Sequence, residues 1–169
     1  KGLVGIQRLL ESISKLDVLE FIERDEGKAI RMFQSVNDRG VPLSKMDIAK
    51  SLLIYHSNRF LNGELDIFIA ERFGAAFKDY SLIKSLSHED GFNVRLIDRD
   101  TFREDDILRY HYFSYDPTPY DPSATFDYNA TAETVLEGFL KPALKRLRGD
   151  LPKLREFIRN YVLDLSKFF

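Results

Sequence analysis

Apolar residues recur at helical spacing along most of this chain, and no other feature constrains its fold as strongly. The spacing predicts helices over residues 2–14, 26–37, 64–86 and 105–112, a helix that begins at Ser44, a helix from residue 132 and a last helix that begins at Asp150. A helix with one apolar face has to bury that face against another element. We therefore expect a mainly α fold, a multi-helix, bundle-like domain with room for one or two short strands.

The clearest boundary between two helices lies at residues 40–44. Glycine favours the backbone conformation that ends a helix and proline cannot continue one, so Gly40 and Pro42 end the 26–37 helix. Ser44 is the expected N-cap of the next helix, with Asp47 three residues later in a variant of the capping box. Apolar residues cover more than one face of this second helix, and we therefore expect it to be well buried.

Three further positions shape the expected elements. Gly74 weakens the middle of the 64–86 helix and is a candidate break. Pro142 lies inside a helical pattern, so we expect a kink there or two short helices. Asp150 is the expected N-cap of the last helix, whose first turn contains a proline. Residues 16–23, LDVLEFIE, are short and favour a strand.

The length of 169 residues is typical of one domain, so we expect a single helical domain over residues 1–169. The chain begins with Lys1 rather than methionine, and we expect it to be a fragment of a larger protein. Residues 114–131 contain three prolines and many turn-forming residues. Their aromatic side chains need somewhere to pack, which predicts a long ordered loop rather than a linker.

Composition excludes several classes of function. The chain has no cysteine, which excludes disulfides, zinc–thiolate sites and cysteine nucleophiles. No stretch approaches the roughly 20 apolar residues of a membrane span, and no signal peptide is visible. We expect a cytoplasmic protein with no membrane partner. The net charge of −2 provides no general attraction to nucleic acid, although residues 141–169 carry eight basic residues against three acids.

No catalytic or metal-binding residue is predicted in this chain. The three histidines, His56, His88 and His111, show no spacing that puts two ligands on one helix face. There is no glycine-rich phosphate loop. The aromatic residues of 109–120 could stack on the bases of a nucleic acid. Their acidic neighbours would repel its phosphates, so the preferred interpretation is a core seam, in which these rings pack in the protein core under a long loop.

A weak nuclease signature lies near the N-terminus. Glu26 and Lys28 form an ExK pattern with Asp17 upstream, the residue types that hold Mg²⁺ and a phosphate in metal-dependent nucleases. That geometry needs the ExK on a strand, whereas here it opens an expected helix, where Glu26 favours the N-terminal dipole. We treat the pattern as a coincidence and keep an autonomous nuclease as a distant alternative.

The corner between the two helices around residue 40 is the most specific feature. Four polar residues lie close to it in the sequence, namely Asn37, Arg39, Asp47 and Lys50. Each has a structural explanation, since Asn37 and Arg39 can reach free carbonyls and Asp47 and Lys50 can pair across one turn. Arg39, Lys50 and the N-terminus of the Ser44 helix could instead hold an anion. The structural interpretation is favoured, and binding stays open.

The same corner resembles a known family. FQSVNDRGVPLSKMDIAKSLL, residues 33–53, is similar to the motif F-x-x-[LIV]-N-x-R-G-x-x-L-[ST]-x-x-D-[LI]-x-K-x-x-L of the GmrSD-type restriction proteins, which carry a ParB/sulfiredoxin-like N-terminal domain. Residues 16–33 and 105–115 resemble the flanks of that motif. The matched positions are Phe33, Asn37, Arg39, Gly40, Leu43, Ser44, Asp47, Ile48, Lys50 and Leu53.

The resemblance implies that the catalytic motifs of the full-length protein lie on segments outside this chain. Family members bind and hydrolyse an NTP through a DGQQR motif, use Mg²⁺ and cleave modified phage DNA with a separate HNH-type nuclease domain. DGQQR and an HNH signature are both missing from these 169 residues. The resemblance therefore implies a bacterial phage-defence protein whose N-terminal core and nuclease are partners of this inactive helical part. Asn37, Arg39, Asp47 and Lys50 would support the nucleotide site or the interface with that core.

A second interpretation needs no enzyme. Helices with long apolar stripes and an acidic loop can serve as a non-enzymatic module for protein–protein interaction. Residues 88–128 carry ten acids against four arginines, and this acidic loop could serve a protein partner. Nucleotide binding at the corner would distinguish the first interpretation from this one.

Overall fold

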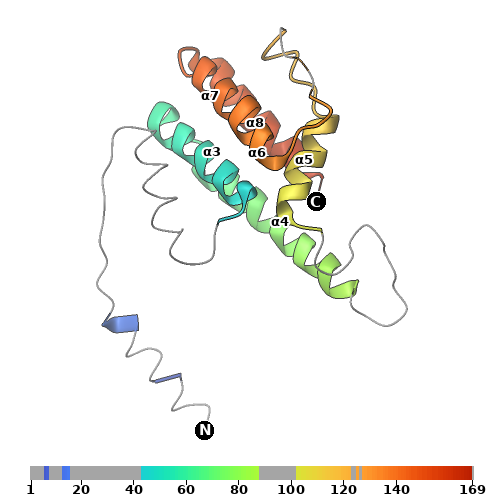
Figure 1. Ribbon diagram of the computed structural model, residues 1–169. Helices are drawn as coiled ribbons and strands as arrows, with labels where there is room; N and C mark the ends of the chain where they lie inside the picture. The colour runs from blue at the N-terminus through green and yellow to red at the C-terminus, as the bar shows by residue number, and fades with distance from the viewer. Residues whose placement is uncertain are drawn as a thin grey trace. The chain divides into compact units, whose positions relative to one another are not determined.

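The computed structural model describes residues 6–7, 13–15, 43–87, 102–122, 125 and 127–168 (Figure 1). Contacts divide the chain into two units, residues 1–42 and residues 43–169. In the first unit, residues 6, 7, 13 and 14 are helical, as expected for a helix over 2–14. The expected strand at 16–23 and helix at 26–37 lie outside the described residues.

The second unit is built from helices, and its described part contains no strand. They are α3 (Lys45–Leu61), α4 (Asp66–Leu86), α5 (Glu104–Ser114), α6 (Ala132–Thr134), the π-helical segment η2 (Val135–Leu140), α7 (Lys141–Leu147) and α8 (Leu151–Ser166). The expected mainly α, bundle-like fold is thus confirmed. None of the helices in the described ranges has the length and apolar character needed to cross a membrane.

Helix α3 lies at the centre of this unit. It contacts α4, α5, α6, η2 and α8, and Figure 1 shows it beside α4 and the C-terminal helices. The expectation that this helix is well buried is confirmed, because its buried residues occupy more than one face. They are Met46, Ile48, Ala49, Leu52, Leu53, His56, Ser57 and Leu61.

A tight turn joins α3 to α4. Asn62 and Gly63 both adopt the left-handed conformation, with φ of 54° and 77°. The Gly63 N–H donates to the Ser57 carbonyl at 3.0 Å, which closes the end of α3. The buried Ser57 hydroxyl accepts from the Leu65 N–H at 3.0 Å, so one side chain fixes the start of the next helix.

Helix α4 runs unbroken from Asp66 to Leu86, and the prediction of a break at Gly74 is wrong. Gly74 is exposed, and no atom lies within 4 Å of the position a Cβ would occupy there. The packing of Ile69, Phe73, Ala76 and Tyr80 on the buried side keeps the helix continuous. Their burial outweighs the roughly 1 kcal/mol by which glycine disfavours a helix.

The interruption expected at Pro142 takes the form of a π-helical stretch. Residues Val135–Leu140 form η2, and Pro142 lies in the first turn of α7 directly after it. Proline lacks an N–H and its ring clashes with the carbonyl four residues earlier, so the regular pattern cannot continue. The Lys141 N–H bonds to the carbonyl of Leu136, five residues back, which keeps the chain helical across the disturbance.

Helix α8 contributes a continuous apolar stripe to the core. Asp150 caps it as expected, with its Oδ1 accepting from the Lys153 N–H at 3.1 Å. The apolar face predicted for this helix is buried at Leu154, Phe157, Ile158, Tyr161, Val162 and Leu165. Phe169, the last residue of the predicted face, lies outside the described residues. Phe157 and Tyr161 stack with ring centroids 5.6 Å apart, and Tyr115 meets Tyr161 edge-on at 5.2 Å. These rings join α8 to α5 and to the loop that follows α5.

Candidate functional site

The described part of the corner begins at Leu43 and contains two of the four residues singled out from the sequence. Asp47 and Lys50 lie in the first two turns of α3, both half-buried, whereas Asn37 and Arg39 lie outside the described residues. Ser44 caps α3 as expected, because its hydroxyl accepts from the Asp47 N–H at 3.0 Å. The same hydroxyl donates to the Asp47 carboxylate at 2.8 Å. Among described residues, Asp47 therefore pairs with Ser44, and no ion pair joins it to Lys50.

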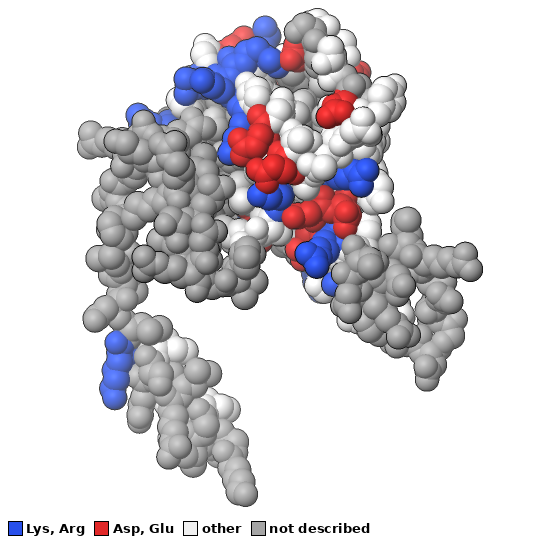
Figure 2. All heavy atoms as spheres, viewed as in Figure 1, with Lys and Arg blue, Asp and Glu red and all other residues white. Residues whose placement is uncertain are grey.

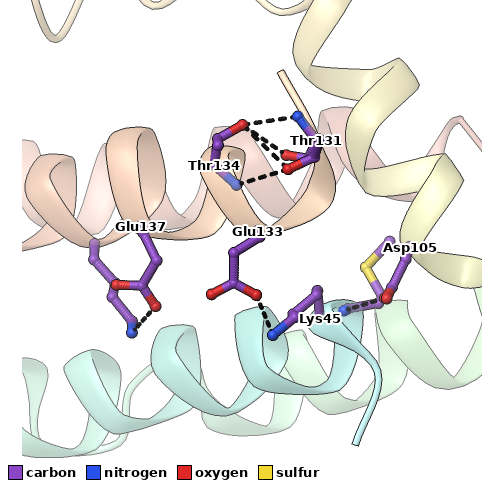
Figure 3. A network of polar contacts seen from close by, with 8 residues as sticks. Lys45, Asp105, Thr131, Glu133, Thr134 and Glu137 are labelled. Carbon is purple, nitrogen blue, oxygen red and sulfur yellow. Dashed lines mark hydrogen bonds and ion pairs between the residues drawn. The ribbon is translucent and has the colours of Figure 1, made fainter. Parts of the chain in front are cut away.

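A second carboxylate reaches the start of α3 from α5. Oδ1 of Asp105 accepts from the Met46 N–H at 3.1 Å, across 59 positions of sequence. On the other side, Lys45 forms an ion pair with Glu133 of α6 (Figure 3). The N-terminal end of α3 is thus held by α5 and α6 together. A carboxylate at a helix N-terminus is also favoured by the helix dipole.

The junction of α3 and α5 is negatively charged. Burial raises the pKa of Glu104, and the neighbouring carboxylates of Asp47 and Asp105 raise it further, against the opposing effect of Lys84. Figure 2 shows acidic atoms gathered over the junction of α3, α5 and α6, with basic atoms beside them. In the described residues, these acids and their neighbours include no group that could hold a metal ion.

The described part of the corner does not fit a phosphate. The Met46 N–H donates to Asp105 and the Asp47 N–H donates to Ser44, so two of the amides that could bind an anion are used. The carboxylates around them repel phosphate oxygens. The anion-site interpretation of this end of α3 is therefore disfavoured, and a role in positioning or contacting another segment is favoured.

A second site, which sequence patterns did not reveal, lies where α5 and α8 end. It is a groove of about 480 Å³, called here the α5–α8 groove. Helix α5 and the loop after it supply one wall, and the last turns of α8 supply the other. The lining residues are Ser114, Tyr115, Asp116, Pro119, Tyr120, Asn160, Leu163, Asp164 and Lys167.

A buried histidine supports the carboxylate in this groove. His111 is fully buried, and its Nε2 lies 3.1 Å from Oδ2 of Asp164, whose side chain is half exposed. Burial lowers the pKa of His111, while the charge and hydrogen bond of Asp164 act in the opposite direction. Burial therefore favours the uncharged imidazole at neutral pH, and with its proton on Nε2 the ring donates to Asp164.

Two tyrosines lie beside this pair. The Tyr115 and Tyr161 rings contact His111 with centroids 5.2 and 5.0 Å from the imidazole. Burial is the main cause that raises the pKa of both hydroxyls, followed by nearby charges that include Asp164. Within the described part of the chain, neither hydroxyl has a hydrogen-bond partner, and neither has Nδ1 of His111.

The loop after α5 is tied to the helices that it crosses. Tyr120 packs edge-on against Phe157, with centroids 5.1 Å apart, and its hydroxyl accepts from Nδ2 of Asn160 at 2.8 Å. Asp121 forms an ion pair with Arg146 of α7 at 2.8 Å. These contacts hold Tyr120 over α8 and make the loop a wall of the groove.

Sequence reasoning missed this groove because His111 and Asp164 are 53 positions apart. It did place residues 109–120 in a core seam, and His111 and Tyr112 are buried there. The one available signal was an acid, Asp164, between the apolar positions Val162 and Leu165 of the last helix. His88 and the Asp17, Glu26 and Lys28 set lie outside the described residues.

Comparison of the chain with protein-family models, with curated proteins and with solved structures finds no match. The resemblance to GmrSD-type proteins therefore depends on the motif in residues 33–53 and on its flanks. In the structure, the described end of that motif is the capped start of α3.

Proposed function

We propose that this chain is the helical part of a GmrSD-like, NTP-dependent restriction protein that acts in phage defence on modified DNA. The observation that supports the proposal is the ten-position motif match, whose positions run from Phe33 to Leu53. The chain is not catalytic alone. Its partners are an N-terminal core and an HNH-type nuclease domain, which contact the NTP, Mg²⁺ and DNA in a cytoplasmic bacterial protein.

Within this proposal, Asp47 and Lys50 support an interface with the N-terminal core. The acids around the start of α3 and its occupied amides argue against direct contact with nucleotide phosphates. Lys50 lies one turn after Asp47 and is half-buried, and no described acid forms an ion pair with it. It is suited to a carboxylate or carbonyl presented by another segment. Asn37 and Arg39, which precede Asp47 and Lys50 in the sequence, are the other two residues proposed to support this interface.

The first test is genetic. The reading frame that encodes this chain should also encode a DGQQR motif N-terminal to it and an HNH signature elsewhere. A complete frame with neither feature would remove the basis of the proposal.

The second test is biochemical and uses the full-length protein. Lys50→Ala should reduce NTP hydrolysis and cleavage of modified DNA, because the core is then poorly positioned. Lys78→Ala is the matched control, since Lys78 is an exposed lysine on α4 away from the motif. Equal loss in both variants, or no loss in either, would contradict a specific role for Lys50. The 169-residue chain alone should not hydrolyse GTP or ATP.

A non-enzymatic interaction module is the second candidate function. The α5–α8 groove favours it, because the groove combines two carboxylates, aromatic walls and an opening to solvent. The two functions are compatible, since a helical part of a restriction protein can also bind a partner.

A further inference from the structure

Both helices that form the α5–α8 groove end at it. Ser114 is the last residue of α5, and Asp164 and Lys167 stand at the end of α8. The last carbonyls of a helix lack intrahelical partners and carry the negative end of the helix dipole. Two such ends at one groove create an environment that favours a positive charge.

Two carboxylates add to this negative potential. His111 Nε2 contacts Oδ2 of Asp164 at 3.1 Å, and Oδ1 of Asp164 has no described hydrogen-bond partner. Hydrogen bonds from the Thr118 hydroxyl and N–H lower the pKa of the exposed Asp116, so it is ionised at neutral pH. Lys167 is the cation among the lining residues, and the lining carries a net negative charge.

The walls of the groove are aromatic and rigidly held. Tyr115 packs against His111 and Tyr161, while Tyr120 is fixed by Phe157 and by Asn160. Aromatic faces attract cations, and a planar guanidinium also stacks on them. The same cation can donate two parallel hydrogen bonds to one carboxylate, which a compact ammonium cannot do with equal geometry.

We propose that the α5–α8 groove binds the guanidinium group of an arginine presented by a protein partner. The arginine donates to Asp164 between the rings of Tyr115 and Tyr120, with Asp116 adding charge at the rim. Phosphate-bearing ligands and acidic peptides are excluded by the two carboxylates and the two helix C-termini. The site is independent of the corner at residues 33–53, so it can be correct even if the proposed restriction function is wrong.

The test uses the intact 169-residue chain and the ¹H–¹³C resonances of its three histidine rings, which are few enough to assign by substitution. N-acetyl-arginine amide serves as the peptide-like probe and methylguanidinium as the free cation. N-acetyl-citrulline amide has the same shape without the charge. The arginine probe should shift the His111 resonance saturably, more tightly than methylguanidinium, whereas the citrulline probe should not shift it.

Substitutions in the groove test which charged side chains contribute to the affinity for the arginine probe. Asp164→Asn should weaken binding by at least about tenfold, because the charged hydrogen-bond acceptor is lost. Glu156→Gln makes the same charge change at an exposed position of α8 outside the groove, and it should leave binding unchanged. Asp116→Asn alters only the exposed loop and should weaken binding by about threefold, while Lys167→Gln should tighten it.

Three outcomes would overturn binding of a guanidinium group at this groove, and a fourth would overturn the protein partner alone. One is equal binding of the citrulline and arginine probes. Another is unchanged affinity in both Asp164→Asn and Asp116→Asn. The last is a uniform shift of all three histidine resonances, which would indicate non-specific association. If methylguanidinium binds as tightly as the arginine probe, the groove takes a free cation and the proposed protein partner is wrong.

Discussion

Nε2 of His111 and Oδ2 of Asp164 lie 3.1 Å apart, and this pair joins the last turn of α5 to the end of α8. The imidazole is fully buried while the carboxylate is half exposed, so the two groups respond differently to pH. Protonating His111 would place a positive charge in the core, next to Tyr115 and Tyr161, and among the described residues Asp164 is the acid that would balance it.

The first prediction concerns pH. Burial lowers the pKa of His111 in the folded chain, so below pH 6.5 the unfolded chain binds more protons. Stability is therefore complete above about pH 6.5 and falls as the pH drops through the lowered folded pKa. The loss is about 1.4 kcal/mol for each unit by which the folded pKa lies below the unfolded one.

Urea unfolding at pH 7.5 and pH 5 measures this effect. The difference between the two pH values should shrink in His111→Gln. The raised pKa of Glu104 acts with the opposite sign, but it is common to both proteins and cancels in the comparison. An unchanged pH dependence in His111→Gln would show that His111 titrates normally.

The second prediction concerns the contact between α5 and α3. Asp105→Ala removes the acceptor for the Met46 N–H and should lower the free energy of unfolding by about 1 kcal/mol. Asp105→Asn keeps an acceptor and should lose less. Asp79→Ala, at an exposed position of α4, should change stability by less than about 0.5 kcal/mol. Denaturant midpoints distinguish these outcomes, and equal effects of the Asp105 and Asp79 changes would contradict the role of this bond.

The third prediction contrasts two glycines. Gly74→Ala should raise stability by about 0.5–1 kcal/mol, because the site is helical, exposed and open. Gly63→Ala should lower it by about 1–2 kcal/mol, since Gly63 has φ of 77° and the added Cβ would lie 3.1 Å from Oδ2 of Asp66. Thermal unfolding of the two variants should give shifts of opposite sign. Stabilisation by both changes would mean that the turn between α3 and α4 tolerates a side chain, and destabilisation by both would contradict the expected gain at Gly74.

The fourth prediction concerns a buried hydroxyl. Tyr161 is fully buried, and its hydroxyl has no hydrogen-bond partner among the described residues. Tyr161→Phe should leave stability unchanged or raise it by about 1 kcal/mol, because an unsatisfied polar atom is removed. Phe157→Ala, in the same stack, should cost about 3–5 kcal/mol through the cavity it leaves. Loss of more than about 1 kcal/mol in Tyr161→Phe, measured by urea unfolding, would show that the hydroxyl has a partner.

Helix positions followed from local chemistry. Ser44 and Asp150 cap the helices that they were expected to cap, because a cap needs only a side-chain oxygen and the amides three residues away. The apolar stripe of α8 is buried as predicted, since a period of 3.6 residues leaves one face for the core. Pro142 disturbs its helix as expected, although sequence reasoning did not indicate that the disturbance is a π-helical stretch.

The sequence by itself determined the helical class, the caps and the buried stripes, since these depend on residues within a few positions of one another. It also contained the motif of residues 33–53, but not the partners of that motif. Only the tertiary structure decided that Asp105 occupies the start of α3 and that Asp164 meets His111. Those contacts span 59 and 53 positions, and they form only when the packing of α3, α5 and α8 brings the helix ends together. No local pattern encodes that arrangement, because it depends on how whole helix faces fit one another.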